Sequence, residues 1–147
     1  MSATGHVFTP GSKAFCDTSP FIYFCEERQP YVAKLQRLFD ENDRGEFQII
    51  TSTLTLVEVL ILPLREQAWG LAAEYQEIII NSPFILVMPM DVAIAREAAR
   101  LRARYRLQMP DAIQVATALV YGCSVFLTND HQLAVVNELK VIQLADQ

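Results

Sequence analysis

Residues 13–20 read KAFCDTSP, and this short stretch indicates the class of fold. Residues 13–16 are a strand signal, in which three apolar residues follow Lys13, and three polar residues bring the strand to an end. Pro20 then suits the first position of a helix, and apolar residues continue through residues 21–24. A strand, a turn and a helix follow each other without a gap, as they do in α/β proteins.

The same alternation continues along the rest of the chain. Further strands are predicted at residues 47–50, 84–88, 125–128 and 141–144. Helices are predicted at residues 31–41, 54–62, 66–80, 91–105 and 110–121, and we expect Pro63 to end the second of these. Strands separated by helices imply a mainly parallel sheet covered on both faces.

The expected architecture is therefore a three-layer α/β fold with about four or five parallel strands between two layers of helices. Residues 12–147 are expected to form one domain, since 147 residues with 52% apolar content are enough for one sizeable core. Residues 1–11 show no periodicity, so we expect a flexible leader.

Composition excludes several classes of protein. The apolar content excludes a largely disordered chain. Residues 1–10 lack the pattern of a signal peptide, and no apolar run reaches the ~18 residues of a membrane span. The three cysteines form no CxxC pair, which favours reduced thiols. We therefore expect a cytoplasmic protein that does not insert into a membrane.

Four carboxylates are expected to meet at one edge of the sheet, outside the carboxyl ends of the strands, where parallel sheets bind their ligands. Asp17 and Asp130 directly follow predicted strands. Glu58 lies near the start of the helix that leaves the strand at residues 47–50. Asp111 opens a helix that runs antiparallel to its strand, so its N-terminus points to the same edge.

Three of these acids also have an ordinary structural explanation. Asp17 suits an Asx turn, and Asp111 and Asp130 suit helix N-caps. Glu58 differs, because it lies in the apolar run 54–62 with no Lys or Arg within a helical turn. A carboxylate in such a run is paired, bound to a metal or expensively desolvated.

A divalent cation is the expected partner of such a cluster, because carboxylates at close range raise each other's pKa. All-oxygen ligands suit Mg²⁺ or Mn²⁺, whereas the lack of a His-x-x-x-His motif or paired Cys argues against zinc. Thr18, Ser19 and Thr128 offer hydroxyl groups that assist as ligands or hold water. These metals activate water for the hydrolysis of phosphodiesters.

Four segments resemble the acidic motifs of PIN-domain nucleases: residues 15–19 (FCDTS), 56–59 (LVEV), 109–118 (MPDAIQVATA) and 127–130 (LTND). The third segment is typical of the VapC toxin branch of that family. The resemblance covers essentially residues 13–144, and it implies a PIN-type parallel sheet.

The resemblance also implies roles for individual residues. The metal-binding and catalytic carboxylates would be Asp17, Glu58, Asp111 and Asp130, with assistance from Thr128 and Ser19. The implied activity is Mg²⁺- or Mn²⁺-dependent cleavage of RNA. The implied partners are a second copy of the chain in a homodimer and a small antitoxin protein. A catalytically silent PIN-like module that binds RNA or a protein remains the alternative.

The charge balance fits a metal site better than a broad surface for nucleic acid. Acids outnumber bases 17 to 12, a net charge of −5, which argues against binding through general phosphate neutralisation. The four candidate ligands account for most of this surplus. Arg96 and Arg100 belong to an arginine-rich segment that either steers RNA or forms a solvated helix face with Glu97 as partner.

A receiver-type phosphoacceptor domain, which also gathers acids at the edge of a parallel sheet, is disfavoured. Receiver domains typically carry paired acids after the first strand and a Lys after the fifth strand. Asp17 has no acidic neighbour, and Lys140 precedes its strand.

Overall fold

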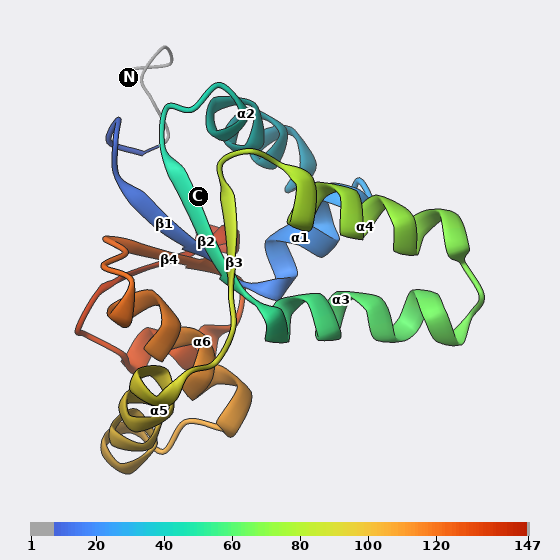
Figure 1. Ribbon diagram of the computed structural model, residues 1–147. Helices are drawn as coiled ribbons and strands as arrows, with labels where there is room; N and C mark the ends of the chain where they lie inside the picture. Colours follow the sequence, from blue (N-terminus) through green and yellow to red (C-terminus); the bar gives the residue numbers. More distant parts are fainter. Residues whose placement is uncertain (1–7, 147) are drawn as a thin grey trace.

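A five-stranded parallel sheet forms the centre of the protein in a computed structural model that describes residues 8–146 (Figure 1). The strands are β1 Lys13–Cys16, β2 Gln48–Ser52, β3 Ile85–Met88, β4 Val125–Thr128 and β5 Lys140–Gln143. Their order in the sheet is β3-β2-β1-β4-β5, and every neighbouring pair is parallel. The predicted mainly parallel sheet is confirmed.

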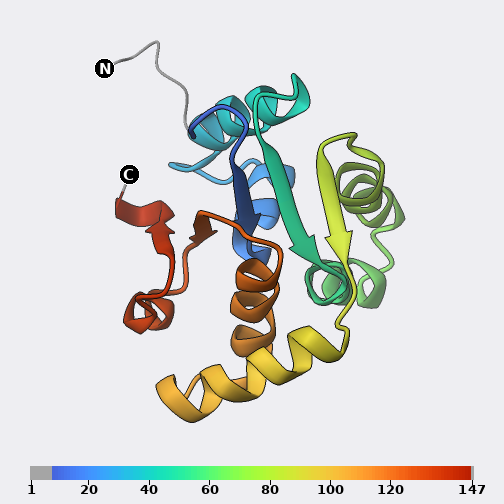
Figure 2. The ribbon, with the colours of Figure 1, turned by 60° about the vertical axis from the view of Figure 1, so that its left-hand side comes forward.

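Six α-helices cover the two faces of the sheet, so the predicted three layers are confirmed (Figure 2). They are α1 Thr18–Cys25, α2 Val32–Asp43, α3 Thr53–Arg65, α4 Trp69–Asn81, α5 Val92–Tyr105 and α6 Met109–Val120. Two short 3₁₀ helices, η1 His131–Val135 and η2 Leu144–Asp146, flank β5. Helices α1 to α4 pack into one buried cluster with the sheet, and α5 and α6 into the other.

Alternation along the strands divides the core between the two faces. In β1, Ala14 and Cys16 point into the cluster of α1 to α4, whereas Phe15 points into the cluster of α5 and α6. Phe15 is paired in register with Phe126 of β4, and the two rings stack with centroids 4.9 Å apart. β1 is the central strand of the sheet, and this position accounts for its burial on both faces.

Three helices start at side-chain caps that the sequence provides. Asp17, Ser52 and Asp91 each accept a hydrogen bond from a backbone N–H in the first turn of the helix that follows. The cap at Asp17 matters most for function, because it fixes a carboxylate directly after the central strand.

The structure departs from the expectation most clearly at Pro63 and in the expected leader. Helix α3 does not end at Pro63 but continues to Arg65, with Pro63 buried inside it. Phe8, which falls in the expected leader, is buried and packs edge-on against Phe47 with centroids 5.0 Å apart. Residues 1–7 of that leader lie outside the described residues.

The strand order creates a switch point between β1 and β4. From β1 the chain builds β2 and β3 on one side and then β4 and β5 on the other, so a crevice opens at the carboxyl ends of β1 and β4. Residues 17 and 129–130 follow these two strands. Within residues 8–146, no helix combines the length and the apolar character needed to cross a bilayer.

Candidate active site

An open pocket of about 310 Å³ lies at this switch point. Its lining includes all four predicted carboxylates, Asp17, Glu58, Asp111 and Asp130. Thr18, Ser19, Ile22 and Asn129 complete the lining. The structure thus brings together acids that are up to 113 positions apart in the sequence.

Asp17 is the most firmly held of the four. One carboxylate oxygen accepts the backbone N–H of Thr18 at 2.8 Å, and the other accepts the Thr128 hydroxyl at 2.7 Å. Burial raises the pKa of Asp17, the hydrogen bonds from Thr128 and Thr18 oppose that rise, and the neighbouring carboxylates add to it. The backbone hydrogen bond comes from the next residue and not from two residues on, so Asp17 caps α1 and does not form an Asx turn; the bond orients the carboxylate at the pocket.

Glu58 is joined to the same turn through a hydroxyl group. The Thr18 hydroxyl donates to a carboxylate oxygen of Glu58 at 2.6 Å, across 40 positions of sequence. Thr18 thus touches two of the acids, Asp17 through its backbone and Glu58 through its side chain. This contact explains how a carboxylate is accommodated in the apolar helix α3.

Asp111 lies in the first turn of α6 and is half-buried. Its pKa is raised from 3.8 to about 6, first by burial and then by the other three carboxylates. A helix N-terminus would by itself lower the pKa of an acid. Burial and the neighbouring negative charges thus both favour the protonated form of Asp111.

Asp130 caps η1, as its ordinary explanation predicts, by accepting the backbone N–H of Gln132 at 3.0 Å. Its own backbone N–H donates to the Thr128 hydroxyl at 3.0 Å. That hydroxyl donates to Asp17, so Thr128 connects the chain segments after β1 and β4. Asp130 therefore both caps η1 and lines the pocket.

Two polar residues were not predicted from the sequence, although both contact the site. Gln114 is buried, and its side-chain amide donates to the Thr55 hydroxyl at 2.7 Å and approaches Asp17 at 3.4 Å. Asn129 donates its backbone N–H to the Ser19 hydroxyl at 3.1 Å. Their nearness in sequence to Asp111 and Asp130 was the available signal, because Gln114 lies one helical turn after Asp111.

The donor set fits a hard divalent cation. Carboxylates and hydroxyls are the only side chains of the pocket that offer oxygen ligands, apart from the Asn129 amide, and none of the lining residues is basic. Within residues 8–146, no three Asp, Glu, His or Cys side chains lie close enough together to form a ligand cage for a metal ion. Mg²⁺ does not require such a cage, since it usually binds one or two carboxylates and keeps several waters.

The two arginines predicted to steer RNA lie outside the pocket lining. Arg100 forms ion pairs with Glu97 and Glu138, both at 2.5 Å, which is the arrangement expected of a solvated helix face. Arg96 is exposed. A steering role for Arg96 or Arg100 stays a prediction.

The sequence matches the model of the PIN domain family over residues 14–139. The chain belongs to the PIN-domain family. No curated protein matches its sequence. This is the family whose acidic motifs the sequence resembles.

Solved structures similar to this PIN domain come from toxin–antitoxin systems. VapBC2 from Rickettsia felis, bound to a promoter DNA fragment, has a TM-score of 0.73 at 10% identity, covering 89% of this chain and 98% of the other. A toxin–antitoxin complex from Klebsiella pneumoniae has a TM-score of 0.68 at 20% identity, with coverages of 89% and 97%.

A third similar structure is VapC20 from Mycobacterium tuberculosis, described as a sarcin-ricin loop cleaving toxin. Its TM-score is 0.66 at 19% identity, and the match covers 86% of this chain and 98% of the other. At these identities the three structures establish a shared fold over nearly the whole PIN domain.

Proposed function

We propose that this PIN domain is a divalent-metal-dependent endoribonuclease and the toxin of a toxin–antitoxin pair. The observation that carries the proposal is the convergence of Asp17, Glu58, Asp111 and Asp130 on one open pocket at the switch point. The similarity to VapBC structures supports the toxin role. We place the protein in the cytoplasm because RNA and a cognate antitoxin are found there.

The proposed chemistry divides between a cation and the chain. A bound Mg²⁺ or Mn²⁺ would lower the pKa of a water ligand and neutralise charge on the phosphate. The chain holds the ligands in place: Thr128 fixes Asp17, and Thr18 fixes both Asp17 and Glu58. An anionic phosphate can enter this acidic pocket only when positive charge compensates the carboxylates.

Asp17→Asn and Asp111→Asn are expected to abolish cleavage of total RNA in the presence of Mg²⁺ or Mn²⁺. We expect a loss of at least about 100-fold, since changes to the outer shell of a metal site alone cost 10- to 100-fold. Cleavage is measured by sequencing the new RNA ends, which also reveals the target, and circular dichroism confirms that each variant is folded.

Asp43→Asn is the matched control, because it removes an exposed carboxylate at the end of α2, near the opposite edge of the sheet. It should cleave as the unchanged protein does. If the unchanged protein cuts no RNA with either metal, the nuclease proposal is wrong, and a silent PIN-like module that binds RNA or a protein becomes the better account.

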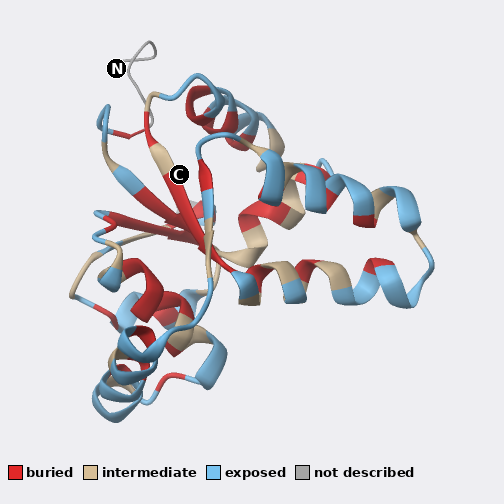
Figure 3. Ribbon diagram, in the orientation of Figure 1, coloured by how far each residue is buried: buried red, intermediate tan, exposed pale blue. Residues whose placement is uncertain are grey.

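Exposed apolar side chains support the proposed protein partners. The hairpin of α3 and α4 projects away from the sheet and is largely exposed at its tip (Figure 3). Ile61, Leu62, Leu64 and Trp69 are exposed there, Trp69 to 62%. Such side chains suit an interface with an antitoxin or with a second copy of the chain.

Each partner has a direct test. A short reading frame next to this gene that encodes a DNA-binding protein should restore growth when it is expressed together with the toxin. Light scattering should give the mass of a homodimer for the purified chain. Failure of the rescue would contradict the antitoxin assignment, and a monomer at micromolar concentration would contradict the homodimer.

A further inference from the structure

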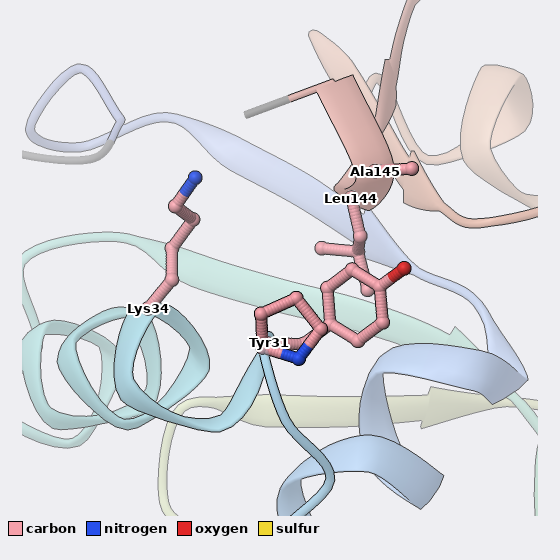
Figure 4. A pocket seen from close by; sticks show the side chains of 5 residues that line it. Tyr31, Lys34, Leu144 and Ala145 are labelled. Atoms are coloured by element: carbon pink, nitrogen blue, oxygen red, sulfur yellow. The ribbon is translucent and has the colours of Figure 1, made fainter.

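A second, smaller pocket of about 130 Å³ lies beside the carboxylate site. Its lining residues are Pro30, Tyr31, Lys34, Leu144 and Ala145. Lys34 rises on one side, Leu144 and Ala145 form the other, and the Tyr31 ring lies between them (Figure 4). Leu144 and Ala145 directly follow β5, so the pocket opens at the same edge of the sheet as the four acids.

Asn129 connects the two pockets physically. It lines the carboxylate pocket, and its side-chain oxygen accepts the backbone N–H of Ala145 at 3.0 Å. Its side-chain amide donates to the Tyr23 hydroxyl at 3.3 Å. A polymer bound at the carboxylates therefore has the second pocket as its immediate neighbour on the β4 and β5 side.

The second pocket offers an aromatic surface. Tyr31 stacks on Tyr23 with ring centroids 4.8 Å apart and an interplanar angle of 14°. Tyr23 covers one face of the Tyr31 ring and is itself anchored by Asn129, so the Tyr31 ring is held in place. Fixed aromatic rings beside a phosphate-binding region are the usual platform for an unpaired nucleobase.

The pocket also carries a cation that is available to a ligand. Its neighbours Arg28 and Arg37 are engaged by Glu26 and Glu41. No carboxylate within residues 8–146 forms an ion pair with Lys34, whose side chain is exposed. In a chain of net charge −5, a free ammonium group next to an acidic pocket is a specific place for a phosphate.

We propose that this pocket binds one nucleotide of the RNA substrate, adjacent to the phosphate that is cleaved. The base lies against Tyr31, and a phosphate oxygen contacts the Lys34 ammonium group. The pocket thereby sets the position of the chain relative to the carboxylates. This inference rests on the proposed nuclease function for the identity of the ligand.

Binding can be tested apart from cleavage. Ribonucleoside 5′-monophosphates, added at millimolar concentration in EDTA, should shift the backbone NMR signals of Tyr31, Lys34 and Ala145. Tyr31→Leu should weaken binding by about tenfold, whereas Tyr31→Phe should retain it, because the stacking surface remains. Lys34→Gln should weaken the nucleotide severalfold and abolish the shifts that inorganic phosphate alone produces.

Lys140→Gln is the matched control, since it removes an exposed charge at the opposite end of β5. It should leave nucleotide binding unchanged. The absence of any shift at these positions, or equal binding by all variants, would overturn the proposal.

The kinetics separate this proposal from the nuclease assignment. In RNA cleavage, Lys34→Gln and Tyr31→Leu should raise KM with little change in kcat, because they remove contacts that the substrate makes equally in the ground state and in the transition state. If the unchanged protein cleaves RNA and both variants keep its KM, the nucleotide pocket is refuted while the nuclease stands. If nucleotides bind at Tyr31 but no RNA is cleaved, the nuclease fails and the pocket remains.

Discussion

Gln114 links the floor of the active site to the two helices that meet there. Its side-chain oxygen accepts the Ser52 hydroxyl at 2.6 Å, and its amide donates to Thr55 at 2.7 Å. All three side chains are buried, and Gln114 is the side-chain partner that the two hydroxyl groups share. The longer contact from the Gln114 amide to Asp17, at 3.4 Å, extends this network to a carboxylate of the pocket.

Replacing Gln114 with Met should lower the free energy of unfolding by about 1–3 kcal/mol, because the change keeps the shape but leaves two buried hydroxyls without their partner. Urea denaturation measures the difference. Gln36→Met is the control: Gln36 is exposed on α2, and the change should stay within about 0.5 kcal/mol. Equal effects of the two variants would show that the buried network does not contribute to the free energy of unfolding.

Sequence reasoning finds the carboxylates of this site and the hydroxyl groups near them, but it misses Gln114 and the partners that the hydroxyl groups bind. Asp17 and Asp130 are predictable because each directly follows an apolar strand, and chain direction then places both at one edge. Gln114 and Thr18 act through partners 59 and 40 positions away. Their roles depend on side-chain distances that periodicity does not specify.

Among the elements, α3 shows why boundaries are harder to predict than the elements themselves. Proline removes one backbone donor, which predicts the end of a helix. In α3 the proline falls near the C-terminus and its ring is buried, so the loss of a single hydrogen bond is offset by packing. The succession of strands and helices along the chain, by contrast, follows from their apolar patterns together with the Pro, Gly and capping residues between them.

Helix α5 ends at a residue whose side chain disfavours the backbone conformation found there. Arg106 adopts a left-handed conformation with φ of 57° while its N–H bonds to the carbonyl of Arg102. Glycine adopts this conformation without the steric cost of a Cβ, so Arg106→Gly should stabilise the protein by about 1 kcal/mol.

Ala103→Gly provides the opposite control within the same helix. Ala103 lies inside the last turn, where glycine should destabilise by about 1 kcal/mol. Thermal unfolding compares the two variants with the unchanged chain. Destabilisation by both substitutions would contradict the argument from the left-handed cap.

At the scale of the whole molecule, the acidic surplus is concentrated by the topology. The net charge is −5, and four of the acids share one pocket. This pocket exists because β1 and β4 are neighbours in the sheet, while the chain leaves β1 toward β2 and leaves β4 toward β5. This concentration opposes folding in the absence of a cation, since the folded state gathers charges that the unfolded chain keeps apart. A bound cation removes that cost, so metal binding and folding should be coupled.

The coupling predicts a characteristic pH dependence for the metal-free protein. The pKa of Asp111 is about 6 in the folded state against an ordinary value of 3.8, so the folded state binds this proton more tightly. Its contribution to stability is fully present below about 3.8 and is lost as the pH rises through 6. In EDTA, the thermal midpoint of the unchanged protein should therefore fall relative to that of Asp111→Asn between pH 4 and 7. Mn²⁺ should raise the thermal midpoint of the unchanged protein more at neutral pH than at pH 5. A parallel pH dependence of the two proteins in EDTA would show that folding does not raise the pKa of Asp111.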